Sequence, residues 1–283
     1  MSGTAIVTDS AADLAPGVAS AAGITVVPLT VSFGAESFRA GVELSTEAFW
    51  DRMVAPDAPF PTTAAASPGA FLEAFEACFA RGVDAIVCVD IAETLSATIT
   101  SARIAAGMLP DREIHVIDAR SASMGAGLLA LMASELARQG VRAARIAAAI
   151  EERKADIDLY VAIDTLEYLR KGGRISGPQA AIGSLLSVKP IITVVNGLVE
   201  VAERVRTRTK ARERVLELLT AGPLERVAIL YAVPADPEAF RDGLLARVAG
   251  LDPARVSIQP IGSSIGPHVG PGALGAVVLR ARE

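Results

Sequence analysis

The feature that most constrains the fold is an alternation, through the first half of the chain, of short β-branched segments with alanine-rich segments of helical apolar spacing. Strands that alternate with helices need crossover connections, and these give a mainly parallel sheet covered by helices on both faces. The segment 67–82 shows the helical signals most clearly, since Ser67 is a capping residue and Pro68 suits the first helical position. Pro28 indicates that the apolar run 24–33 is an edge strand or contains a bulge. The predicted strands are 4–9, 24–33, 84–91 and 113–118, and the predicted helices are 12–23, 45–54, 67–82, 95–109 and 122–140.

The second half of the chain has a different pattern, which predicts a second domain. Asn196-Gly197 lies between two β-branched runs and is the strongest short-range signal for a hairpin. Further strands and helices alternate after it, and a hairpin combined with returning helices predicts an α/β sandwich with a mixed sheet. We place the boundary near Asp156–Asp158, so that the predicted domains are 1–157 and 158–283.

Composition excludes several classes of protein. The formal net charge is −5 and aromatic residues make up 4%, so we expect neither a field that attracts phosphate backbones nor a stacking surface for nucleic acid. The longest apolar stretch, 124–133, is too short to span a bilayer, and the first residues lack a secretory signal. Cys78 and Cys88 have no metal or redox spacing and are predicted to be buried thiols. We expect a cytoplasmic protein with no nucleic-acid partner and no integral membrane association.

Small polar residues follow three of the predicted parallel strands, at the sheet edge where ligands bind in such folds. Strand-end aspartates usually cap the next helix, and no metal-ligand spacing is present, so we expect no metal site. A G-x-G-x-x-A match begins at Gly125, but it lies too far beyond the strand for a dinucleotide site and predicts close helix packing. We therefore expect no cofactor. The strand-end residues are Asp9–Ser10, Asp90–Ser96 and Asp118–Ser123.

The segment 265–275, IGPHVGPGALG, carries His268, one of two histidines in the chain. Its four glycines and two prolines argue against a regular helix and predict a shaped turn. With Ser96 and Asp9, His268 offers the side chains of a hydrolase triad, although no G-x-S-x-G elbow is present. A lone histidine in such a turn is more often structural than functional.

Basic residues gather in the second half of an otherwise acidic chain. Arg204, Arg206 and Arg208 alternate, so on a strand they would share one face. Two interpretations stay open for this cluster and for the basic residues Arg170 and Arg174. It forms either a solvated edge that discourages aggregation or a surface that binds an acidic partner.

Six segments in order resemble the DegV family, and together they cover Asp9 to Gly275, nearly the whole chain. One such motif would be weak, whereas six with matching order and spacing are specific. The segments are VTDSAADL at 7–14, TAAASPGAF at 63–71, ETLSATITSA at 93–102, DTLEYLRKGGRIS at 164–176, KPII at 189–192 and IGPHVGPGALG at 265–275.

The resemblance implies a bacterial protein that holds a long-chain fatty acid in a buried tunnel. It also implies that the chain does no chemistry alone but is the acyl-carrying subunit of a fatty acid kinase. A separate ATP-binding kinase subunit would phosphorylate the carboxylate. Two alternatives stay beside this prediction: a lipid or ester hydrolase that uses Ser96 and His268, and a binding protein for another lipid-like ligand.

By the same resemblance, the carboxylate is bound at the interdomain cleft by Thr63, Ser96, the N–H of Ala97 and His268. The chain departs from the family pattern at two positions. Ala64 stands where a serine is usual, and Ala97 stands where a glycine is usual, so a positive φ at Ala97 would be strained. The residues predicted to face the kinase subunit are Arg170, Arg174, Arg204 and Arg206.

Overall fold

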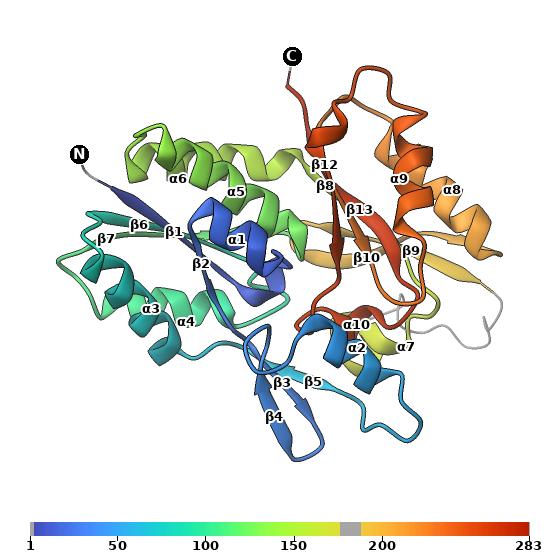
Figure 1. Cartoon of the computed structure of the whole chain (residues 1–283), viewed down its shortest axis with the longest axis horizontal. Coiled ribbons are helices and arrows are strands. Elements are labelled where there is room, and N and C mark those ends of the chain that lie inside the picture. Colours follow the sequence, from blue (N-terminus) through green and yellow to red (C-terminus); the bar gives the residue numbers. More distant parts are fainter. Residues whose placement is uncertain (1–2, 176–187, 283) are drawn as a thin grey trace.

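The first half of the chain builds a four-stranded, entirely parallel sheet, as the alternation predicted. The structure is a computed structural model that describes residues 3–175 and 188–282. The strand order is β2-β1-β6-β7, and helices cover both faces (Figure 1). The strands are β1 (Thr4–Asp9), β2 (Ile24–Val27), β6 (Ala85–Asp90) and β7 (Glu113–Asp118), with helices α1 (Pro16–Ala22), α3 (Pro68–Ala80), α4 (Thr98–Gly107), α5 (Met124–Arg138) and α6 (Ala143–Arg153) and the short 3₁₀ helices Ser10–Ala12 and Lys154–Asp156.

The prediction of a single strand over 24–33 was wrong. The chain leaves the parallel sheet at Pro28, which has no N–H for the ladder, and Leu29 donates its N–H to the Ser10 hydroxyl instead (2.9 Å). The second part of the run forms β3 (Thr30–Phe33), the middle strand of a separate antiparallel sheet of order β4-β3-β5. Its partners are β4 (Glu36–Arg39) and β5 (Thr62–Ala64), and α2 (Thr46–Met53) connects them.

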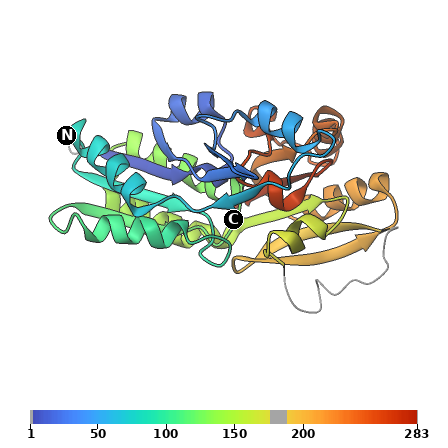
Figure 2. The ribbon, with the colours of Figure 1, turned by 90° about the horizontal axis from the view of Figure 1, so that it is seen from below.

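The second half forms the predicted mixed sheet, of strand order β10-β9-β8-β13-β11-β12. β11 and β12 are parallel and the other neighbours are antiparallel. Asn196 and Gly197 both have positive φ, as a tight hairpin turn requires. The two halves lie side by side along the long axis (Figure 2). The elements are β8 (Ile157–Ala162), α7 (Glu167–Lys171), β9 (Lys189–Val195), β10 (Leu198–Val205), α8 (Arg208–Leu219), β11 (Leu224–Tyr231), α9 (Pro237–Leu245), a 3₁₀ turn (Pro253–Arg255), β12 (Val256–Pro260), α10 (Gly266–Val269) and β13 (Leu274–Arg280).

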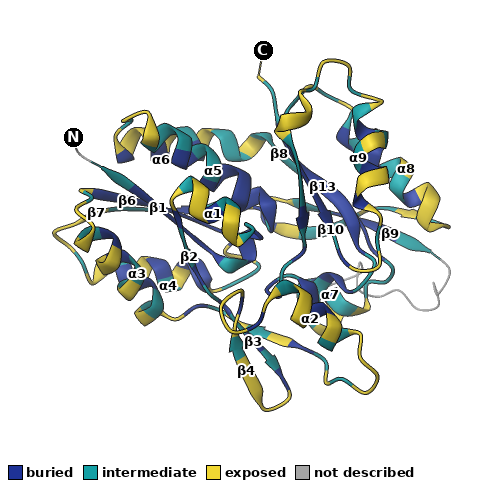
Figure 3. Cartoon of the chain, in the orientation of Figure 1, coloured by how far each residue is buried: buried dark blue, intermediate teal, exposed yellow. Residues whose placement is uncertain are grey.

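The small sheet and α2 belong to the same hydrophobic cluster as the inner face of the mixed sheet. Phe33 and Phe49 are buried there together with Val161 and Leu230. Figure 3 shows the strands of the mixed sheet coloured largely as buried. The Trp50 indole N–H donates to the carbonyl of Ile261 across this contact (2.8 Å). Residues 30–64 therefore join the two halves, and the division at residue 157 stays a prediction.

Several local predictions are confirmed. Ser67 caps α3 by accepting from the Ala70 N–H (3.2 Å). Cys78 and Cys88 are buried free thiols. A Cβ at Gly125 would lie 2.0 Å from the Ser121 hydroxyl oxygen, so the G-x-G-x-x-A match serves close packing, as predicted.

The segment around His268 differs from the predicted turn, because it contains one helical turn, α10. This turn packs directly on α2: a Cβ at Gly266 would lie 2.3 Å from Cε1 of Phe49. Glycine is therefore required at this position by contact with another element.

The aspartates at the ends of β1 and β6 are fully buried side by side. Asp9 accepts from the Ala11 N–H (2.7 Å) and the Ile91 N–H (3.0 Å), so it caps two chain segments. Burial raises the pKa of Asp9 to about 6, and burial together with the charge of Asp9 raises the pKa of Asp90 well above its usual value. No group of three or more metal-ligating side chains occurs in the described parts of the chain.

Gly266→Ala should lower the free energy of unfolding by about 1–3 kcal/mol, because the new methyl group overlaps Phe49. Gly17→Ala in α1 is the matched control: nothing lies within 4 Å of its Cβ position, and stability should stay equal or rise by up to about 1 kcal/mol. Urea unfolding of both variants measures the difference. Equal stabilities would contradict the packing argument.

The buried aspartates should make the protein less stable as the pH rises from about 4 towards 7. An acid whose pKa is raised in the folded state binds more protons folded than unfolded in this window, so each group contributes a slope of up to about 1.4 kcal/mol per pH unit. The amide in Asp90→Asn cannot ionise. The free energy of unfolding of this variant, measured with urea, should therefore rise relative to that of the wild type as the pH increases. A constant difference across the window would overturn this explanation.

Candidate functional site

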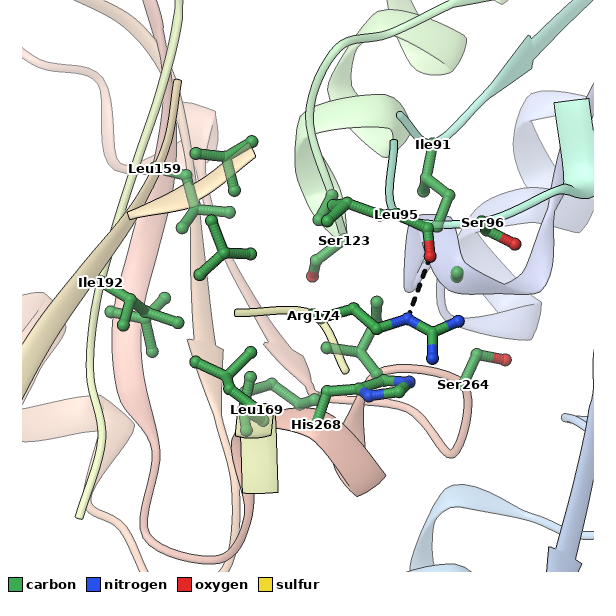
Figure 4. A pocket seen from close by; sticks show the side chains of 18 of the residues that line it. Ile91, Leu95, Ser96, Ser123, Leu159, Leu169, Arg174, Ile192, Ser264 and His268 are labelled. Carbon is green, nitrogen blue, oxygen red and sulfur yellow. Dashed lines mark hydrogen bonds between the residues drawn. The ribbon is translucent and has the colours of Figure 1, made fainter. Parts of the chain in front are cut away.

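A pocket of about 740 Å³, its mouth included, lies between the two halves of the molecule (Figure 4). The first half contributes the chain segments after β1, β6 and β7, and the second half contributes β8, β9, β10 and α10. The carboxyl ends of the parallel strands therefore face the pocket, as the fold class predicts.

One part of the pocket wall is entirely apolar and comes mainly from the mixed sheet. Side chains two apart on a strand share a face, so Leu159 with Val161 and Ile192 with Val194 point into the pocket together. These positions could not be separated from ordinary core in the sequence. The apolar residues contributed by β8, β9, β10 and β11 are Leu159, Val161, Ile192, Val194, Val199 and Leu230.

The polar part of the wall contains a threonine–histidine pair. The Thr63 hydroxyl lies 3.1 Å from Nε2 of His268, although 205 residues separate them. Burial, with a smaller effect of the nearby Arg174 charge, lowers the pKa of His268 to about 4. The ring is therefore neutral at pH 7, with one N–H donor and one acceptor nitrogen. Nδ1 is buried and has no hydrogen-bond partner among the described residues.

Ser96 also lines the pocket, from the loop before α4. Its hydroxyl lies 2.7 Å from that of Thr98. No hydrogen bond joins Ser96 to His268 among the described residues, and no carboxylate orients the ring there. This geometry lacks the relay that a hydrolase triad requires.

The two departures from the family pattern cause no strain in the backbone. Ala97 has φ −71°, so the strain that a positive φ would cause at this position does not arise. Ala97 is exposed at the start of α4 and its side chain does not line the pocket. Ala64 is also exposed, and alternation along β5 directs it away from the face of Thr63.

Arg174 lies in the pocket wall, although the sequence placed it among the partner-facing residues. Its Nε donates to the Leu95 carbonyl (3.1 Å), and the guanidinium group lies near Ser264 and His268 (Figure 4). The pocket therefore contains a fixed cation that the predicted set of neutral donors lacked. Ser176, the last residue of the same motif, lies outside the described residues.

The other predicted partner-facing arginines, Arg170, Arg204 and Arg206, are exposed. None of the three forms an ion pair with another described residue. Arg204 is on β10, but the strand ends at Val205 and Arg208 begins α8, so the predicted shared strand face does not exist.

Ser123 and Ser264 line the pocket as well, and neither was among the predicted head-group residues. Ser123 follows β7 in the predicted strand-end set, which was the one available signal. Ser264 had none, because its place depends on folding of the distant C-terminal segment.

No helix within residues 3–175 and 188–282 is both long and apolar enough to cross a bilayer. The chain also matches known proteins along its length. A DegV domain-containing protein of Streptomyces coelicolor is 37% identical over 278 residues, 97% of each chain.

Two solved structures are similar in fold. A DegV family protein of Thermus thermophilus, described by its fatty acid binding, has a TM-score of 0.89 and 33% identity, covering 99% of this chain and 100% of its own. A stearic-acid-binding protein of Eubacterium ventriosum has a TM-score of 0.86 and 27% identity, covering 99% of this chain and 98% of its own. The family model described as uncharacterised protein, DegV family, matches residues 3–281, and the chain therefore belongs to the DegV family.

Proposed function

We propose that the chain binds a long-chain fatty acid in the pocket and presents its carboxylate to an ATP-binding fatty acid kinase subunit. The observation that carries the first part is an apolar pocket whose polar wall combines a neutral imidazole with a guanidinium group. The ligands named for the Thermus and Eubacterium structures support the same ligand class.

The apolar wall would provide affinity without orientation. Burying about 15 methylene groups contributes on the order of 10 kcal/mol before the entropy of binding is subtracted. This apolar contribution to the binding free energy changes little with the position of the acyl chain along the pocket. The polar groups must therefore fix the position of the ligand.

The carboxylate would bind where Thr63, Ser96, His268 and Arg174 meet. A buried carboxylate without hydrogen bonds is strongly unfavourable, and these side chains offer hydroxyl, imidazole and guanidinium donors. The Ala97 N–H at the start of α4 is a further candidate donor. Arg174 would compensate the ligand charge, since its own two described hydrogen bonds are to the backbone carbonyls of Leu95 and Gly172.

Presentation to a kinase would use the exposed arginines. Arg170, Arg204 and Arg206 are free of ion pairs among the described residues, so binding an acidic partner would not require an internal pair to break. The three arginines therefore meet the requirement for binding an acidic partner.

The purified protein should carry a long-chain fatty acid or take up stearate. Native mass spectrometry measures the mass of the bound ligand, and solvent extraction then identifies its acyl chain. His268→Ala should weaken stearate binding about tenfold or more, because a hydrogen bond to a charged group is lost. His115→Ala is the control, since His115 pairs with Glu113 at the partly exposed end of β7.

A protein that is bare and does not take up stearate would contradict the proposal. A different extracted lipid would favour the alternative lipid-like ligand. Release of fatty acid from esters by the pure protein, lost in Ser96→Ala, would instead favour the hydrolase.

Charge reversal at Arg204 and Arg206 should impair the kinase step alone. We expect the variant with both residues changed to Glu to bind stearate normally. Its bound stearate should be phosphorylated about tenfold or more slowly by the cognate ATP-binding subunit, because like charges at an interface lower the association rate. A variant with Arg142 and Arg145 both changed to Glu, two exposed positions at the start of α6, controls for the same change in net charge. Equal rates for both variants would remove this face from the kinase interface.

A further inference from the structure

The segment Asp9–Asp13 organises the pocket, although its polar side chains are not part of the pocket wall. The Asp9 carboxylate accepts hydrogen bonds from the N–H groups of Ala11 and Ile91. Ala11 and Ile91 both line the pocket. The Ser10 hydroxyl accepts from the Leu29 N–H and lies 2.8 Å from the hydroxyl of Ser264. The motif therefore connects chain segments that are far apart in sequence.

Asp13 makes the longest of these connections. It is 6% exposed, and its backbone has the left-handed conformation, φ 53° and ψ 29°. Oδ1 accepts from the Gly262 N–H (2.9 Å), 249 residues away. Oδ2 lies 2.6 Å from the Ser123 hydroxyl oxygen, 110 residues away.

Both hydrogen-bond partners of Asp13 belong to chain segments that line the pocket. Gly262 begins the short loop that carries Ser264 and His268. Ser123 is buried, lines the pocket and has φ 53° and ψ −139°, a conformation that is strained for any residue except glycine. Figure 4 places Ser123 between the apolar wall and Arg174. Strain of this kind persists only where the surroundings hold the residue in place, and the bond to Asp13 does so.

We propose that Asp13 is a positioning residue of the pocket, which fixes Ser123 and the Gly262–His268 loop and whose proton decides whether the Ser123 hydroxyl donates to Asp13 or to the bound ligand. The inference deepens the proposed function and rests on it for the identity of the ligand.

The two protonation states of Asp13 have opposite effects on Ser123. A protonated Asp13 donates to the Ser123 oxygen and leaves the serine proton free for a ligand carboxylate. An ionised Asp13 instead accepts a hydrogen bond from the Ser123 hydroxyl, so the pocket loses a donor and gains a nearby negative charge. Fatty acid affinity should therefore fall as the pH rises and Asp13 ionises.

The surroundings of Asp13 put this change near neutral pH. Burial raises its pKa to about 7; the hydrogen bonds from Ser123 and Gly262 oppose the rise, and the charge of Asp9 adds to it. A groove on the other side of Asp13 is lined by two titratable residues, Glu47 and Tyr231. The other titratable or charged groups near this region, among the described residues, are Asp90 at the end of β6, and Arg174 and His268 across the pocket. His268 is neutral throughout this range because its pKa is about 4.

The test is the stearate dissociation constant of the full chain between about pH 6 and 8.5. Wild-type affinity should fall about tenfold across the range, as expected for one hydrogen bond to a charged group. Asp13→Asn keeps an acceptor for Gly262 and gains an N–H for Ser123, so it should bind as the wild type does at pH 6 and keep that affinity at pH 8.5. In a Ser123→Ala background the difference between the two proteins should shrink to the smaller effect of the Asp13 charge alone.

Asp118→Asn is the matched control, because Asp118 ends a neighbouring strand and, among the described residues, its carboxylate accepts only from the Arg120 N–H. It should keep the wild-type pH profile. A purely structural role for Asp13 predicts that Asp13→Asn binds stearate more weakly than the wild type at every pH. That result would overturn the inference, and so would the same pH dependence of stearate binding in Asp13→Asn as in the wild type.

A readout without ligand separates this inference from the proposed function. In Asp13→Ala the NMR signals of the His268 ring should move, whereas in Asp118→Asn they should not. Unmoved signals overturn the positioning role even if stearate binds. Moved signals support it even if the wild type binds no stearate, in which case only the proposed function fails.

Discussion

The hydrogen bonds that cross between the two halves at Asp13 are the constraint on which the pocket depends. A cavity lined by apolar side chains tends to collapse, because protein interiors pack densely and voids are unfavourable. Here the segments after β1, β7 and β12 meet at one buried carboxyl, which needs both of its partners because an unsatisfied buried polar group costs more free energy than the bond itself contributes. These segments cannot close on the space without breaking those bonds. The pocket is therefore maintained by polar contacts at its rim, while its apolar wall provides the surface that a ligand would use.

The electrostatics of the polar wall follow from the same burial. Desolvation and Arg174 together keep His268 neutral, so one fixed positive charge, rather than two, would face a carboxylate. A neutral ring beside a threonine can reverse its donor and acceptor roles, which a charged ring cannot. Such a site can bind an anion and can also tolerate a change in that anion's charge. This property suits a carboxylate that is bound, altered by a partner and released.

The parts of this structure that could be predicted from the sequence are those determined by residues close together in the chain. The parallel sheet, the hairpin at Asn196-Gly197 and the cap at Ser67 depend on neighbouring residues, and each is in the structure as predicted. The small sheet was missed because β2 and β3 form one apolar run whose division at Pro28 depends on a bond to Ser10. Whether an alanine at position 97 is strained depends on its φ, which residue type alone does not determine; the structure has φ −71° there, which alanine adopts without strain.

The missed pocket residues share a different cause. Ser264 and Arg174 reach the pocket only because segments distant in sequence fold back on it, and no periodicity encodes such contacts. The resemblance identified Thr63, Ser96 and His268 as residues that belong together, but it could not supply the cation or the carboxyl behind them. Long-range polar contacts of this kind require the three-dimensional structure.

Two packing contacts around α10 explain why two glycine-rich motifs occur in the same chain. The Gly172-Gly173 pair ends α7, and a Cβ at Gly172 would lie 2.2 Å from Nδ1 of His268. The side of the imidazole that lacks a hydrogen bond is thus packed against backbone, and Phe49 packs against Gly266 on the same turn. Larger residues at either glycine would push the ring away from Thr63. The glycines therefore act together, since they allow α7 and α2 to approach α10 closely enough to hold one neutral imidazole at the pocket wall.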